Sequence, residues 1–291
     1  METIVQGVTM AAIYTIVAVS FNVIYRPTNI FNFAQGDLLV IGALLAATLV
    51  RSFGVPWYGA AAIAIAFVMI VSLAIYVLAV APVIAKSPHS SGWIITTLAA
   101  SIIIHEITEK IAGSDPRVLA APPPLNVRIV DFGAFSASTY QFALVAFTCL
   151  LVLAAELVDS TRSGRAVRAI AEDREASLLR GIDPKRMTRL SFAIGGAVAA
   201  VSGILAAPLL FASTALGWTL LLKGFLVVAI GGIGSNRGAI AAALVIAMIE
   251  TAAARVLSPA LQDTVVFAAA LGILLVRPEG LAGADTGRRL V

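Results

Sequence analysis

Long, uninterrupted apolar runs constrain this chain more than any other feature. A helix rises about 1.5 Å per residue and a bilayer core is about 30 Å thick, so a run of roughly 18 apolar residues can cross it. Only 12% of the residues are charged and 60% are hydrophobic, too little polar surface for a soluble enzyme. The sequence predicts an all-α, polytopic transmembrane helical bundle of eight or nine membrane segments, some of them broken or half helices. The runs lie at residues 5–25, 30–50, 57–81, 92–111, 139–158, 190–211, 217–230, 239–256 and 264–276.

The distribution of basic residues predicts the orientation of these segments. The net charge is +4, but the basic residues flank the apolar runs, which favours a positive-inside arrangement over nucleic-acid binding. Residues 159–189 hold eight of the twenty Lys and Arg residues, so we expect this loop in the cytoplasm. Counting outward puts residues 112–138, with three consecutive prolines, in an ordered external loop with a short hairpin. Arg51 then falls on the outer side, against the rule.

Two polar interruptions predict a translocation path. Residues 29–37 read NIFNFAQGD, and residues 230–238 read IGGIGSNRG, where four glycines in nine residues break the helix. Polar groups at membrane depth are expensive facing lipid, although Asn and Asp at a helix start also serve as caps. Paired breaks in the two halves of an apolar chain are the best sequence indication of a path. The candidate path residues are Asn29, Asn32, Gln35, Asp37, Gly231, Gly232 and Gly234.

Few residues in the chain suit other chemistry. The single cysteine, Cys149, excludes an intrachain disulfide, and neither metal-type Cys/His spacing nor a P-loop occurs, so no cofactor or metal is expected. Lys223 and Glu250 are the deepest ionisable residues, and they either pair or line the path. An intramembrane enzyme would need a nucleophile and a base, such as Ser101 with His105, but no orienting acid is evident near them in the sequence. No catalytic residue is predicted.

The basic loop contains a predicted short helix. Asp173 is placed to cap a helix starting at Arg174, Glu175 lies in its first turn, and Gly181 can end it in the left-handed conformation. Leu178 and Leu179 would then give this helix an apolar side on a cytoplasmic loop, which favours a docking helix over a merely solvated one.

These motifs resemble those of the branched-chain amino acid ABC permeases, of the H-subunit type of the leucine/isoleucine/valine importers. The resemblance rests on IFNFAQGDLL, AEDREASLLRGI, GGIGSNRG and RPEGL, which occur in the family's order over nearly the whole chain. It implies one permease domain over residues 1–291 in the bacterial inner membrane, with a cytoplasmic coupling loop at 159–189. Ser177 stands where the coupling motif usually has alanine, and Gln35 stands where many relatives have histidine. The resemblance assigns ATPase coupling to Glu175, Ala176, Ser177, Leu178, Leu179 and Gly181.

The resemblance also implies the partners of the chain. They are a second, homologous permease subunit, two cytoplasmic ATPase subunits, membrane lipid and a periplasmic binding protein that the 112–138 loop helps to seat. The cargo would be branched-chain or other apolar amino acids, while urea, short-chain amides and aromatic acids stay open. A stand-alone secondary transporter is a further alternative, with Asp37 and Glu250 as its only candidate carboxylates.

Overall fold

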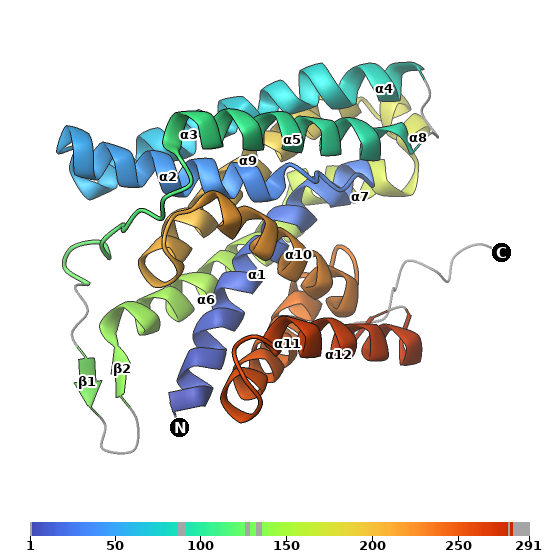
Figure 1. The fold of residues 1–291 in the computed structure, drawn as a ribbon. Coiled ribbons are helices and arrows are strands. Elements are labelled where there is room, and N and C mark those ends of the chain that lie inside the picture. Colours follow the sequence, from blue (N-terminus) through green and yellow to red (C-terminus); the bar gives the residue numbers. More distant parts are fainter. Residues whose placement is uncertain (1, 87–90, 126–128, 132–135, 279, 282–291) are drawn as a thin grey trace. The chain divides into compact units, whose positions relative to one another are not determined.

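The computed structural model describes residues 2–86, 91–125, 129–131, 136–278 and 280–281. Each apolar run predicted above contains a helix, and the only paired strands among the described residues form one short hairpin (Figure 1). The all-α, polytopic fold is thereby confirmed. Packing divides the chain into two compact units, which are described separately; the prediction of one domain over the whole chain stays a prediction. Three of the four unit boundaries fall inside helices, namely α1 (Glu2–Thr28), α6 (Thr139–Ser160) and α10 (Thr214–Gly231), and the fourth follows Pro124.

The larger unit, residues 23–124 and 157–222, is built on three helices that pack against one another. These are α2 (Gln35–Phe53), α3 (Trp57–Ile75) and α9 (Pro184–Leu210), and Figure 1 shows them side by side. Small residues allow the close approach: a Cβ on Gly203 of α9 would lie 2.0 Å from the carbonyl oxygen of Leu39. Helix α3 continues through a π turn (Tyr76–Val80) into α4 (Ala81–Lys86), and α5 (Gly92–Ala112) packs against α2.

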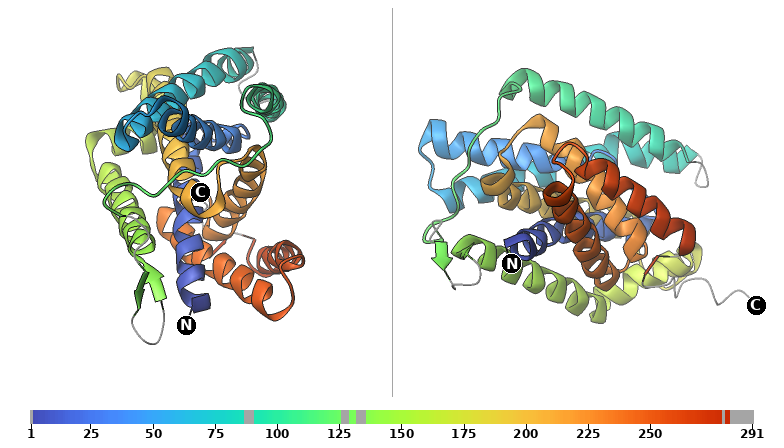
Figure 2. Two further views of the ribbon diagram at one scale, coloured as in Figure 1. Left: turned by 60° about the vertical axis from the view of Figure 1, so that its left-hand side comes forward. Right: turned by 60° about the horizontal axis from the view of Figure 1, so that its bottom comes forward.

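The other unit contains residues 2–22, 125–156 and 223–281 of the described chain. Its C-terminal helices α11 (Asn236–Val256) and α12 (Gln262–Val276) pack together (Figure 2). Strands β1 (Ile129–Asp131) and β2 (Ser136–Ser138) pair antiparallel, with Val130 opposite Ala137, and lead into α6. The predicted hairpin in the 112–138 loop is thus present, while residues 126–128 and 132–135 lie outside the described residues.

Seven of the described helical segments are long and apolar enough to cross a membrane. They include α3 to α4 as one 30-residue segment, Trp57–Lys86. Of the remaining apolar helices, α12 has 15 residues. Helix α5 has 21 residues but carries Glu106, Glu109 and Lys110 in its last two turns. These two helices occupy the other two predicted runs.

The start of the second segment differs from the prediction. We expected it to begin at Ile30, but residues 29–34 are irregular and α2 begins at Gln35. Asn29 adopts a positive φ of 55°, which ends α1, and the side-chain oxygen of Asn32 accepts from the backbone N–H of Ala34. Local side-chain hydrogen bonds of this kind compete with helix formation. The apolar pattern could not reveal this break.

Candidate functional site

The irregular segment before α2 is held by hydrogen bonds between buried amides. The side-chain N–H of Asn32 donates to Oε1 of Gln35 at 3.2 Å, and Nε2 of Gln35 donates to the carbonyl oxygen of Gly195 on α9 at 2.8 Å. Asn32 is 0% exposed and Gln35 is 1% exposed. Both side chains therefore fix the backbone of the segment, and neither is open to a path within its own unit.

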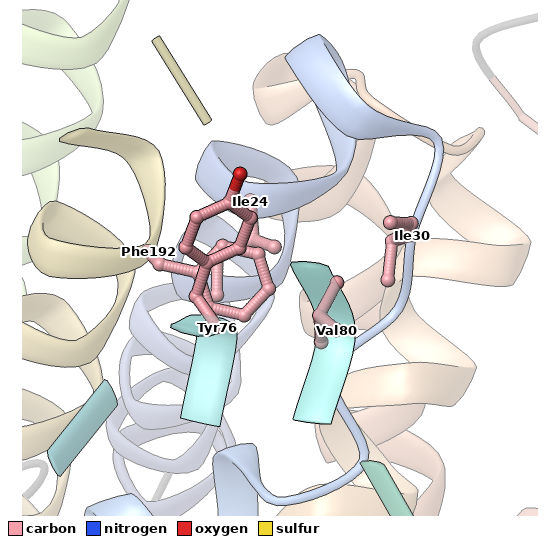
Figure 3. Close-up of a cluster of buried hydrophobic side chains, with 5 residues drawn as sticks. All are labelled: Ile24, Ile30, Tyr76, Val80 and Phe192. Atoms are coloured by element: carbon pink, nitrogen blue, oxygen red, sulfur yellow. The ribbon is translucent and has the colours of Figure 1, made fainter. Parts of the chain in front are cut away.

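An apolar cluster also anchors the segment between α1 and α2. Ile30 points into a group of buried side chains from α1, the π turn and α9 (Figure 3). The rings of Tyr76 and Phe192 pack with their centroids 5.2 Å apart. The hydroxyl of Ser72 donates to the carbonyl oxygen of Phe192 at 2.6 Å, which joins α3 to α9. The segment between α1 and α2 is thus a shaped, anchored element and not a loose loop.

Asp37, in the first turn of α2, is the centre of a polar cluster. Ser101 Oγ on α5 donates to Asp37 Oδ2 at 2.5 Å, and Nδ1 of His105 lies 3.4 Å from Asp37 Oδ1. Ser101 and His105 are four residues apart, so α5 presents both on one face. The sequence analysis found no acid near Ser101 and His105. The structure corrects this expectation, because it places the carboxylate of Asp37 beside both residues. The hydroxyl of Ser101 donates to the carboxylate and not to the imidazole, so the geometry is not that of a nucleophile and its base.

A cavity of about 240 Å³ opens beside this cluster. Its lining includes the polar residues Asp37, Ser101, His105 and Glu106 and the apolar side chains of Phe33 and Trp218. Ionisable groups at membrane depth face protein or water and not lipid. A cavity lined by both carboxylates and apolar groups can hold a small molecule with an ammonium group and an aliphatic body.

The glycine-rich break between α10 and α11 belongs to the other unit. Gly232 and Gly234 have positive φ angles of 93° and 84°, and a Cβ on Gly231 would lie 2.6 Å from the backbone of Gly238. Ser235 caps α11 by accepting from the N–H of Gly238 at 3.0 Å. The predicted break is therefore a tight, capped turn whose conformation requires glycine.

A buried asparagine of α1 holds this turn in place. Oδ1 of Asn22 accepts from the N–H of Gly234 at 3.1 Å, and Nδ2 of Asn22 donates to Oδ1 of Asn236 at 3.0 Å. Asn22 is 0% exposed. The sequence analysis missed this residue, because a lone asparagine in an apolar run carries no local sign of a partner more than 200 positions away.

The predicted helix in the basic loop is present as α8 (Arg174–Leu179). Asp173 Oδ1 accepts from the N–H groups of Glu175 and Ala176, both at 2.9 Å, and Gly181 has a φ of 76°. The preceding amphipathic helix, α7 (Arg162–Glu172), contacts α8. The predicted cap and stop are both confirmed.

The two leucines of α8 point away from their own unit. Leu178 is 57% exposed and Leu179 is 92% exposed, whereas Ser177 is buried and donates to the carbonyl oxygen of Arg174 at 2.8 Å. Ser177 therefore supports the helix from within. The leucines form an apolar surface with no cover in the described part of the chain.

The amino-acid sequence matches a known family over almost its whole length. The family model described as branched-chain amino acid transport system / permease component matches residues 3–275. The chain belongs to this permease family. It is a multi-pass transport permease.

Curated relatives agree with this assignment. The chain is 30% identical over 297 residues to the high-affinity branched-chain amino acid transport system permease protein LivH of Salmonella typhimurium, covering 97% of this chain and 95% of the relative. It is 30% identical over 298 residues to LivH of Escherichia coli K12, with the same coverage. The BraD permease of Pseudomonas aeruginosa is 28% identical over 296 residues. No solved structure matches the chain significantly.

The permease also contains a charged cluster in which Lys223 and Glu250 are buried and Asp263 is exposed. Lys223 Nζ on α10 lies 2.6 Å from Glu250 Oε1 on α11 and 3.0 Å from Asp263 Oδ1 on α12. The hydroxyl of Tyr14 donates to Glu250 Oε2 at 2.6 Å. Of the two interpretations left open for Lys223 and Glu250, the structure supports pairing. The contributions of Tyr14 and Asp263 were not predicted.

The predicted path residues therefore lie in four different settings. Asp37 lines a cavity, Asn32 and Gln35 hold a backbone segment, and Asn29 is an exposed residue at the end of α1. Gly231, Gly232 and Gly234 form the capped turn of the other unit. The tertiary fold brings Ser101 and His105 to Asp37. The sequence analysis had considered these two residues only as a possible nucleophile and base.

Proposed function

We propose that this chain is the membrane-spanning permease subunit of an ABC importer for branched-chain or other apolar amino acids in the bacterial inner membrane. The family description and the printed names of its relatives support the cargo class. In this proposal the chain works with a second, homologous permease, two cytoplasmic ATPase subunits and a periplasmic binding protein. ATP hydrolysis takes place on the partner ATPases, and this chain carries no catalytic residue.

The observation that carries this proposal is the exposed leucine pair of α8. A short helix capped at both ends is rigid, and two neighbouring exposed leucines give it an apolar surface that fits a groove on a partner. We place residues 159–189 in the cytoplasm and 112–138 outside, so α8 faces the ATPases. Glu175, Ala176, Ser177, Leu178, Leu179 and Gly181 then form the coupling helix.

The cavity at Asp37 is the proposed stretch of the translocation path in the larger unit. Its carboxylates receive the ammonium group of an amino acid, while Phe33 and Trp218 contact the apolar side chain. Asn32 and Gln35 position the segment that carries Asp37, and the glycine turn with Gly231, Gly232 and Gly234 is the corresponding break in the other unit. Breaks of this type allow one part of a transporter to rock against another.

Coexpression with the ATPase subunits and the second permease tests the proposal. We expect an affinity-tagged Leu178→Ala/Leu179→Ala permease to co-purify about tenfold less ATPase than the unmodified permease. The variant loses the contacts of two leucines that binding of the ATPase would bury. Leu150→Ala/Leu153→Ala is the matched control, since both leucines are exposed in the middle of α6. Equal ATPase retention by the α8 variant and the control would overturn the placement of the coupling surface.

A further inference from the structure

A long apolar groove lies between α2, α3 and α5 in the larger unit. Its volume is about 720 Å³, and side chains such as Leu44, Phe67, Val71, Ile104 and Ile107 line it. It is distinct from the cavity at Asp37, because the two share no lining residue. The groove is apolar enough for a hydrocarbon chain, and two of the helices that line it, α2 and α3, are long and apolar enough to cross a membrane.

The groove carries two cationic groups and no carboxylate among the described residues that line it. Arg51, in the last turn of α2, and Arg117, after α5, are both lining residues. Arg117 donates to Thr48 Oγ1 and to the carbonyl oxygen of Ala112, which uses two of its five N–H donors. Arg51 is exposed and has no hydrogen-bond or ion-pair partner within the described ranges.

Aromatic residues place this end of the groove at a membrane–water interface. Helix α3 begins with Trp57 and Tyr58, a few residues after Arg51. Trp57 Nε1 donates to the carbonyl oxygen of Ala120 at 3.0 Å, and the hydroxyl of Tyr58 donates to the carbonyl oxygen of Pro123 at 2.5 Å. Trp and Tyr with their polar edges hydrogen-bonded are typical of the headgroup level. We therefore expect the guanidinium groups of Arg51 and Arg117 at the level of lipid phosphates.

We propose that this groove binds a phospholipid, with one acyl chain between α2, α3 and α5 and its phosphate held by Arg51 and Arg117. A guanidinium group matches a phosphate through paired N–H donors, so an anionic lipid gains more than a neutral one. An acyl chain also fills apolar space that water does not occupy favourably. On the proposed topology the site is in the outer leaflet, where the positive-inside rule disfavours arginine, and phosphate binding accounts for Arg51 there.

Native mass spectrometry of the intact, delipidated permease tests the site with phosphatidylglycerol and phosphatidylcholine as probes. The unmodified protein is expected to bind one added lipid molecule tightly, and to bind phosphatidylglycerol more tightly than phosphatidylcholine. Arg51→Gln is expected to weaken phosphatidylglycerol binding about fivefold, the effect of one arginine near an anionic headgroup. Lys110→Gln is the matched control, since it removes an exposed charge from the last turn of α5 without touching the groove. A second variant, Thr108→Phe, would put a ring into the groove and is expected to lower binding of both lipids.

Two outcomes would overturn the proposal. Equal weakening by Arg51→Gln and Lys110→Gln would mean that lipid gathers around the protein through general charge attraction. Crosslinking of the Thr108→Cys variant, in a Cys149→Ala background, to the second permease and not to a photoactivatable lipid would mean that protein covers the groove. The test does not depend on which solute the importer carries.

Discussion

The ammonium group of Lys223 lies 2.6 Å from a carboxylate oxygen of Glu250, and both side chains are buried. Removing one partner of a buried pair leaves a charge without compensation, at a cost of about 3–5 kcal/mol. Lys223→Met is therefore expected to lower the thermal unfolding midpoint of the purified permease strongly, because buried Glu250 would keep only the hydroxyl of Tyr14 as a partner. The double variant Lys223→Met/Glu250→Leu is expected to recover much of that loss, because neither buried charge remains and the carboxylate of Asp263 is exposed to solvent. A double variant as unstable as the single one would contradict this account of the pair.

The carboxylate of Asp37 is expected to matter for transport more than for assembly. Asp37→Asn removes the charge that would meet the cargo ammonium group, worth about 1.5–3 kcal/mol for a hydrogen bond to a charged group. We expect kcat/KM for uptake in vesicles to fall about tenfold to a hundredfold, while the ATPases still co-purify. Asp115→Asn, an exposed carboxylate outside the cavity, is the control. Similar uptake by both variants would remove Asp37 from the proposed path.

Gly203 determines how closely α9 approaches α2. A Cβ at this position would lie 2.0 Å from the carbonyl oxygen of Leu39, so Gly203→Ala must push the two helices apart. We expect a loss of about 1–3 kcal/mol, as for other overpacked sites, read as a lower unfolding midpoint in detergent. Gly272→Ala on α12 is the matched control, because a Cβ there meets nothing within 4 Å. An unchanged midpoint for Gly203→Ala would show that this helix crossing can relax freely.

Asn22 is expected to be needed for the turn between α10 and α11. Asn22→Leu would leave the N–H of Gly234 and the amide of Asn236 without their partner, at about 1–3 kcal/mol for each unsatisfied group. The expected result is lower stability and slower uptake. Ser20→Ala tests specificity, since Ser20 is equally buried but bonds only to the backbone of Val17 in its own helix. Equal effects of the two changes would deny Asn22 a special role.

Local signals predicted the local structure of this chain well. The cap at Asp173 and the stop at Gly181 involve residues within a few positions of each other, so the sequence was sufficient to predict α8. The apolar runs predicted every long helix for the same reason. The predicted start of α2 was wrong because the true start depends on the backbone of Asn29 and the side chain of Asn32, which an apolar pattern does not record. The π turn after Ile75 had no sequence signal either.

Contacts between distant residues could not be predicted in the same way. Asp37 meets His105 across 68 positions, and Tyr14 meets Glu250 across 236. Periodicity shows which face of a helix is polar but not which other helix it meets. The sequence therefore supplied most members of the polar clusters, while only the tertiary fold shows that Ser101 and His105 belong with Asp37.

The most direct test of the importer account is uptake of radiolabelled leucine by vesicles that contain the complete complex. The complex is this permease with its second permease, ATPase subunits and binding protein, and parallel samples contain labelled isoleucine, valine, urea and an aromatic acid. We expect aliphatic amino acids to accumulate only when ATP and binding protein are both present. Uptake by this permease alone, without ATP or binding protein, would contradict the account and identify a stand-alone transporter, whereas ATP-driven uptake of urea alone would contradict the proposed cargo.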